Sequence, residues 1–199
     1  RKGLDVNLKG KAAKEEFQVK KPAVYALMPD DFTGMKPKVV VKENDVVKVG
    51  DALFVDKNHP EIKFVSPVSG RVTMVERGDR RKVLSVRVEA DAEQQYVDFG
   101  KKSAGQMTAQ EVKALLLESG LFAFFKQRPY DVTANPTDTP KAIFVSAFNS
   151  MPLAADFEYV LRGREADFQA GLDALAKMAK TYLGVSSKQT ATALTAAKN

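Results

Sequence analysis

The sequence predicts a chain of mixed α and β structure, with a mainly β region over residues 1–100 and part of an α/β region over residues 101–199. Two observations lead to this division. Valines and turn pairs of Gly, Asn and Asp recur through residues 36–90, which is typical of short strands joined by tight turns. After residue 100, apolar residues follow helical spacing in segments that alternate with short apolar strands. That order of elements predicts parallel strand pairing.

In the β region, the Val39–Val41 run predicts one strand, and a second is predicted where Leu84, Val86 and Val88 alternate with polar residues. No helix is expected between Val39 and Val55. The expected core residues are apolar side chains spaced along these strands: Val46, Leu53, Phe64, Val72, Val86 and Val88.

The α/β region opens with a capping box from Thr108 to Glu111, followed by a helix that ends at Ser119-Gly120. Residues 142–145 predict a buried strand, because a short apolar run is bounded there by turn signals. A second helix is expected over residues 165–180 and a second strand over residues 181–185, and the final polar segment predicts another helix.

The composition excludes several classes of site. The chain carries 31 Lys and Arg against 25 Asp and Glu, a formal net charge of +6. It has no cysteine, which excludes disulfides, thiolate metal sites and a cysteine nucleophile, and its one histidine, His59, stands beside a proline in a turn. No phosphate-binding glycine motif occurs, and no apolar run approaches the roughly 18–20 residues of a membrane helix. Nothing here indicates a self-contained enzyme.

The segments 45–54 and 66–72 resemble the two halves of a biotinyl/lipoyl-type barrel-sandwich hybrid, because each pairs an Asp/Gly or Ser-Pro-x-x-Gly turn with a hairpin. In lipoyl domains the cofactor is attached to a lysine at the position that Lys57 matches. One hypothesis is therefore an acyl-carrier module with lipoylated Lys57. The alternative is an ordinary turn lysine, which the long spacing from Lys57 to Ser66 and the intervening Pro60 favour.

Two further segments have open interpretations. Residues 77–82 form a basic hairpin, but no aromatic residue lies between Phe64 and Tyr96, so we expect a solvated turn or a contact to an acidic partner and no nucleic acid. Residues 118–130 have the highest aromatic density. They could line a pocket for a planar ligand, although we expect at least two of Phe122, Phe124 and Phe125 to be core.

Taken together, short segments along the whole chain resemble the A subunit of the sodium-translocating NADH:quinone oxidoreductase, Na⁺-NQR. The segments are residues 2–5, 34–37, 53–57, 64–70, 77–78, 128–129, 141–145, 152–155 and 171–173. Because the members of that family are much longer, the chain is expected to be an N-terminal part. The resemblance implies a bacterial respiratory complex of six different subunits, lettered A to F. NADH is oxidised on the F subunit, and quinone is reduced while sodium is exported. The A subunit is the peripheral member on the cytoplasmic side of the inner membrane, next to the membrane-embedded B subunit.

The family is also similar to the flavoprotein subunit of respiratory complex I, which implies the same type of α/β domain here. Those relatives hold flavin with a glycine-rich loop. The matching stretch here, residues 120–125, carries bulky side chains that would keep backbone amides away from a phosphate. We therefore expect no cofactor on this chain, with flavins, iron–sulfur centres and NADH on other subunits.

The resemblance implies a part in quinone binding. If this chain contacts quinone, we expect two loops, residues 31–35 and 126–130, to contribute Met35, Arg128 and Tyr130. Methionine is adaptable, tyrosine offers a flat face and a hydroxyl, and arginine can donate to a ring carbonyl. The alternative is that both loops pack against the membrane-embedded partner or the rest of the protein.

Overall fold

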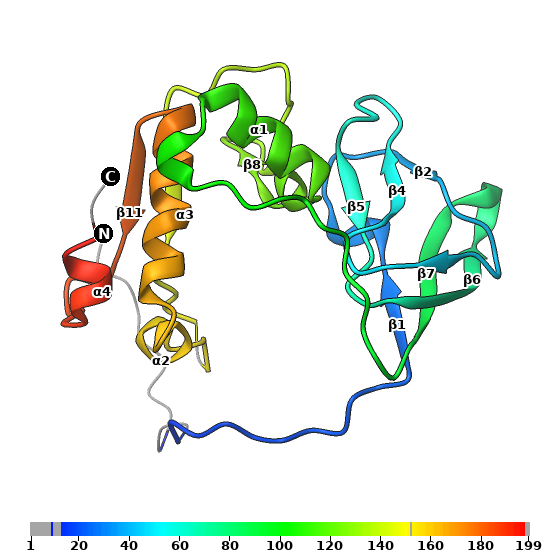
Figure 1. Cartoon of the computed structure of the whole chain (residues 1–199), viewed down its shortest axis with the longest axis horizontal. Helices are drawn as coiled ribbons and strands as arrows, with labels where there is room; N and C mark the ends of the chain where they lie inside the picture. Colours follow the sequence, from blue (N-terminus) through cyan, green and yellow to red (C-terminus); the bar gives the residue numbers. More distant parts are fainter. Residues whose placement is uncertain (1–8, 10–12, 152, 198–199) are drawn as a thin grey trace. The chain divides into compact units, whose positions relative to one another are not determined.

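The computed structural model describes residues 9, 13–151 and 153–197, so the resembling segment 2–5 lies outside the described residues. The chain divides into two compact units (Figure 1). The β unit comprises residues 20–102 and 110–139, and the α/β unit comprises the described parts of residues 1–19, 103–109 and 140–199. The two units interleave along the chain. The predicted domain boundary at residue 100 stays a prediction.

The β unit contains two larger antiparallel sheets that share one core. The four-stranded sheet has the order β1 (Val24–Leu27), β7 (Val83–Ala90), β6 (Gly70–Arg77) and β3 (Val46–Val47). The three-stranded sheet has the order β2 (Pro37–Val39), β4 (Ala52–Asp56) and β5 (Lys63–Val65). As predicted, no helix occurs between Val39 and Val55, a segment that the structure describes in full.

The core of the β unit confirms five of the six expected residues. Fully or almost fully buried are Leu53, Phe64, Val72, Val86 and Val88. The prediction for Val46 is wrong: its side chain is 71% exposed, and Val47 is buried in its place. Side chains alternate between the two faces of a strand, so an error of one residue in register reverses the face.

A helical segment completes this unit. It consists of α1 (Ala109–Glu118), the 3₁₀ turn η4 (Leu121–Phe124) and the hairpin of β8 (Lys126–Gln127) and β9 (Val132–Thr133). Gly120 ends the helix with a φ of +76°, as the Ser-Gly signal predicts. A Cβ at this position would lie 2.6 Å from Val65 Cγ1, so glycine lets the turn approach β5 closely.

The α/β unit contains the parallel strand pair that the sequence predicts. Its elements are η3 (Ala104–Gln106), β10 (Ile143–Ser146), α2 (Phe157–Leu161), α3 (Glu165–Met178), β11 (Thr181–Gly184) and α4 (Thr192–Thr195). In the parallel register, Ile143 is paired with Thr181 and Phe144 with Tyr182. Ile143 and Thr181 are buried, whereas Phe144 and Tyr182 are exposed and stack with ring centroids 5.2 Å apart. One face of the strand pair is therefore buried within this unit.

Candidate functional site

The two loops named above as candidates for a quinone contact lie together in the β unit. The backbone N–H of Thr133 in β9 donates a hydrogen bond to the backbone oxygen of Thr33 at 2.9 Å. The Thr133 hydroxyl donates to the same oxygen at 3.3 Å. The structure thus joins residues 31–35 to the β8–β9 hairpin, a contact that sequence spacing alone could not predict.

Gly34 allows this close contact. Its φ is +87°, and a Cβ built on it would lie 2.7 Å from the Val132 Cβ. Any L-residue here would need both a left-handed backbone and space that Val132 already occupies. Glycine at position 34 is therefore a structural requirement of the paired loops.

The hairpin presents the two other predicted residues at its turn. Its register pairs Gln127 with Val132, and the backbone N–H of Asp131 donates to the Gln127 oxygen at 2.9 Å. Tyr130, at the turn, is 76% exposed. Arg128 is also exposed, and its Nη1 lies 3.3 Å from Asp131 Oδ1. The phenol face and the remaining guanidinium donors of the turn are accessible to a ligand.

Met35 differs from these two residues, because it is half-buried and packs against the core. Close to it in sequence, Phe32 makes edge-to-face contacts with Phe64 at 4.6 Å and with Phe124 at 6.0 Å between ring centroids. Phe124 is 70% exposed, so a series of aromatic rings leads from the core to the surface. A planar ligand could extend such a series by stacking.

The prediction that at least two of the three clustered phenylalanines belong to the core is confirmed. Phe122 is buried, and Phe125 is partly buried against the same core, with the two rings stacked at 5.4 Å. Phe124 alone of the three is exposed.

Lys57 lies in the turn after β4. The buried carboxylate of Asp56 fixes this turn, because its Oδ1 accepts hydrogen bonds from the backbone N–H groups of Lys36 at 3.2 Å and Asn58 at 3.0 Å. The Lys57 backbone N–H donates to the Lys36 oxygen at 2.7 Å, and its side chain is exposed. This geometry accommodates both hypotheses, so lipoylation of Lys57 stays an alternative.

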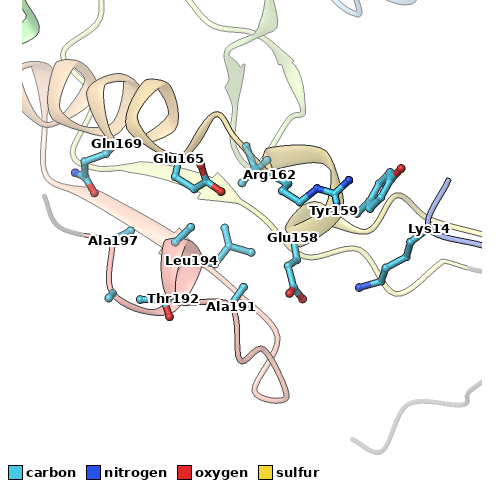
Figure 2. A pocket seen from close by; sticks show the side chains of 13 residues that line it. Lys14, Glu158, Tyr159, Arg162, Glu165, Gln169, Ala191, Thr192, Leu194 and Ala197 are labelled. Atoms are coloured by element: carbon cyan, nitrogen blue, oxygen red, sulfur yellow. The ribbon is translucent and has the colours of Figure 1, made fainter. Parts of the chain in front are cut away.

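A hollow of about 640 Å³ lies in the α/β unit, and no pattern in the sequence indicates it. Figure 2 shows side chains from α2, α3 and α4 gathered around it, with Glu165 directed toward Leu194. Arg162 lies over the Tyr159 ring, 5.1 Å from its centroid. The hollow could not be found from a motif, because separate segments contribute a few side chains each.

One ion pair organises the wall of this hollow. Lys14 Nζ lies 3.1 Å from Asp156 Oδ2, and Asp156 also caps α2 by accepting from the backbone N–H groups of Glu158 and Tyr159. The hydrogen bond from Lys14 and the two backbone donors hold the pKa of Asp156 below its usual value. The same pair raises the pKa of Lys14. The lining combines this charged wall with the apolar Leu161 and Leu194, so it suits an amphipathic group.

Two absences among the described residues bear on the type of site. Within residues 9, 13–151 and 153–197, no group of three or more His, Asp or Glu side chains could hold a metal ion. None of the helices in that same part of the chain is long and apolar enough to cross a membrane.

Comparisons with known proteins agree with the predicted fold. The family model of the NqrA N-terminal barrel-sandwich hybrid domain matches residues 1–91, and that of the NqrA second alpha/beta domain matches residues 107–199. The chain is thus a barrel-sandwich hybrid followed by an α/β region, as expected.

Curated relatives carry the name of the A subunit of the Na(+)-translocating NADH-quinone reductase. The chain is 35% identical over 187 residues to that of Pseudomonas aeruginosa (strain UCBPP-PA14), which covers 92% of this chain and 42% of the relative. It is 36% identical over 181 residues to that of Actinobacillus pleuropneumoniae serotype 5b (strain L20), which covers 89% of this chain and 40% of the relative. The chain therefore spans well under half the length of these relatives.

Proposed function

The chain belongs to the NqrA family, and from that premise we propose that it acts as the A subunit of a bacterial Na⁺-translocating NADH–quinone reductase. Support comes from two family models that together match residues 1–91 and 107–199, and from relatives that carry this name. The chain contributes to an oxidoreductase as one of its subunits, and it is not catalytic by itself.

Within the complex, the chain is the peripheral member on the cytoplasmic side of the inner membrane. Its partners are the B to F subunits, above all the membrane-embedded B subunit. NADH, the flavins and the iron–sulfur centres belong to other subunits, and electrons pass from NADH to quinone while Na⁺ is exported. This chain binds no cofactor of its own and contributes to the quinone site.

The observation that supports quinone binding best is the pairing of the loops 31–35 and 126–130 through Thr33 and Thr133. The pairing brings together two segments that carry the residues suited to a quinone ring. Tyr130 supplies a flat face and a hydroxyl donor, Arg128 supplies donors for a ring carbonyl, and Met35 supplies an adaptable apolar contact.

Copurification of a tagged form of the protein with its complex, followed by photo-cross-linking to a quinone analogue, tests this function. We expect the B to F subunits to copurify and the label to fall on residues 31–35 or 126–130. An excess of unlabelled quinone should suppress the label. If the subunits copurify but the label falls only on other segments, the chain still belongs to the complex. The two loops would then be excluded from the quinone site.

A further inference from the structure

The outer half of the β6–β7 hairpin extends beyond its neighbouring strands. β1 pairs with β7 along Val86–Glu89 alone, and β3 pairs with β6 along Gly70–Arg71 alone. The residues from Glu76 to Ser85 therefore form a two-stranded arm within the described chain, with Val83 and Ser85 buried on its inner face (Figure 1). The basic segment 77–82 noted in the sequence is the tip of this arm.

Two of the arginines at the tip have an unusual backbone. Arg80 has a φ of 52° and Arg81 a φ of 61°, both in the left-handed region. Glycine or asparagine adopts this conformation at lower cost than arginine. The conformation of the turn therefore does not explain why arginine stands at both positions. The explanation must come from the side chains.

The other basic side chains of the tip, Arg77 and Lys82, have partners within the chain, and Asp79 is the one acidic residue among residues 77–82. Lys82 Nζ donates to Asp30 Oδ2 at 2.6 Å, and Arg77 Nη1 donates to the backbone oxygen of Arg81 at 3.3 Å. Within the described residues, the guanidinium groups of Arg80 and Arg81 make no hydrogen bond or ion pair. Both side chains are exposed, so two guanidinium groups remain available to an external anion.

An apolar side chain lies beside these charges. Leu84 is 37% exposed, and its Cδ1 lies 3.1 Å from the position that a Cβ on Gly78 would take. A pair of free arginines next to an exposed leucine suits the interface of a bilayer, where headgroup phosphates lie above acyl chains. The arginine fork binds phosphate oxygens in a bidentate manner, and the leucine can enter the apolar layer.

We propose that the tip of the β6–β7 arm binds an anionic phospholipid surface, with Arg80 and Arg81 contacting the headgroup phosphates. Acidic protein segments would satisfy the charges equally well but would give no role to the exposed Leu84. The proposal extends the proposed function and rests on it for the presence of a membrane. The arm then orients the β unit on the bilayer.

Co-sedimentation of the 199-residue chain with vesicles tests the proposal directly. We expect binding to vesicles of phosphatidylglycerol and phosphatidylcholine at low ionic strength, weakening as salt is added, and little binding to pure phosphatidylcholine. The double variant Arg80→Asn/Arg81→Asn should bind about 25-fold more weakly, at about fivefold for each charge removed. Asparagine accepts the left-handed backbone, so this variant should fold at least as well as the parent.

The matched control is Lys20→Asn/Lys21→Asn, which removes the same net charge. These lysines precede Ala23, whose backbone oxygen accepts from Ala90 N–H at 2.8 Å, so they lie near the end of β7 opposite the tip. The control should retain most of the vesicle binding. If both double variants lost vesicle binding equally, the binding would depend only on the net charge of the chain, and the proposal would be overturned.

Three other results would also overturn it. They are absence of binding to the anionic vesicles, equal binding to neutral vesicles, and binding to polyglutamate without binding to the vesicles. The last result would assign the arm to an acidic protein. Because the experiment uses neither quinone nor the other subunits, its failure would leave the proposed function untouched, and failure of copurification would leave the vesicle result untouched.

Discussion

Thr133 donates two hydrogen bonds, one from its backbone and one from its side chain, to the backbone oxygen of Thr33, a residue 100 positions earlier in the chain. This pairing fixes the β8–β9 hairpin against residues 31–35. Two loops that are remote in sequence thereby form one surface, and substitutions on either side of the contact should affect both.

Replacing Gly34 with alanine should destabilise the β unit, because the new Cβ would lie 2.7 Å from the Val132 Cβ. Gly100 provides a matched control: its φ of +80° is similar, but a Cβ there would meet nothing within 4 Å. We expect Gly100→Ala to lower the free energy of unfolding by about 1 kcal/mol and Gly34→Ala by about 2–4 kcal/mol. Urea unfolding measures the free energy of unfolding of both variants. Equal decreases in the two variants would show that the loops can separate without an energetic cost.

Substitutions in the paired loops should weaken quinone binding in the assembled complex. Tyr130→Phe removes the hydroxyl donor and retains the flat face, so we expect the apparent KM for quinone to rise about fivefold. Tyr130→Ala combined with Met35→Ala should raise it further, while assembly and NADH oxidation by an artificial acceptor stay intact. An unchanged quinone KM in the double variant would leave these loops a purely structural role.

The cap of α2 should depend on pH through Asp156. Lys14 and the backbone donors lower the pKa of this carboxylate, so its stabilising effect is present above the unfolded-state pKa and is lost as the pH falls through the lower folded pKa. Asp156→Asn keeps a capping oxygen but has no charge to titrate.

Amide hydrogen exchange at Tyr159 is the suitable measurement. Protection should be greater in the parent than in Asp156→Asn near neutral pH, and the difference should begin to shrink near the unfolded-state pKa of about 4 and disappear below the lower folded pKa. Asp156→Ala should lose protection at every pH. A difference that persists in acid would contradict the role of the ionised carboxylate.

Lys57 should be unmodified when the protein is produced in a host that attaches lipoate. The reason is that the long spacing from Lys57 to Ser66 and the intervening Pro60 differ from the pattern of lipoyl domains. Intact mass spectrometry decides this, and a lipoyl adduct on Lys57 would favour the acyl-carrier hypothesis instead.

The purified chain should bind neither FMN nor NADH with useful affinity. In residues 120–125 the Gly120 hydrogen faces Val65, and Phe122 is buried in the core, so this segment packs inward instead of presenting backbone amides to a phosphate. Gel filtration in the presence of FMN provides the measurement. Stoichiometric flavin absorbance in the protein peak would refute it.

Local patterns predicted much of the fold because strands and helices carry their periods in the sequence. The alternation at Val86 and Val88 correctly marked a buried face, but its extension to Leu84 was wrong, since the register shifts near the tip and exposes that side chain. The parallel pairing of β10 and β11 followed from the order of elements.

Contacts between segments that are distant in the sequence could not be predicted, and the reason is again physical. Nothing near Thr33 in sequence indicates its partner Thr133, because that hydrogen bond depends on how α1 and its following hairpin fold back onto the β unit. The hollow beside α2 likewise requires Lys14 and Leu194 in one place. The family resemblance implied quinone and the chemistry of the side chains selected the two candidate loops, but neither indicated that the loops are in contact.

The arm formed by β6 and β7 has a further consequence, for the behaviour of the protein at high concentration. Beyond the registered pairs with β1 and β3, both of its edges lack a neighbouring strand among the described residues. Such edges can pair with those of another molecule and start aggregation. The cluster of positive charges at the tip makes two arms repel each other, so neutralising these charges should raise the tendency of the protein to self-associate.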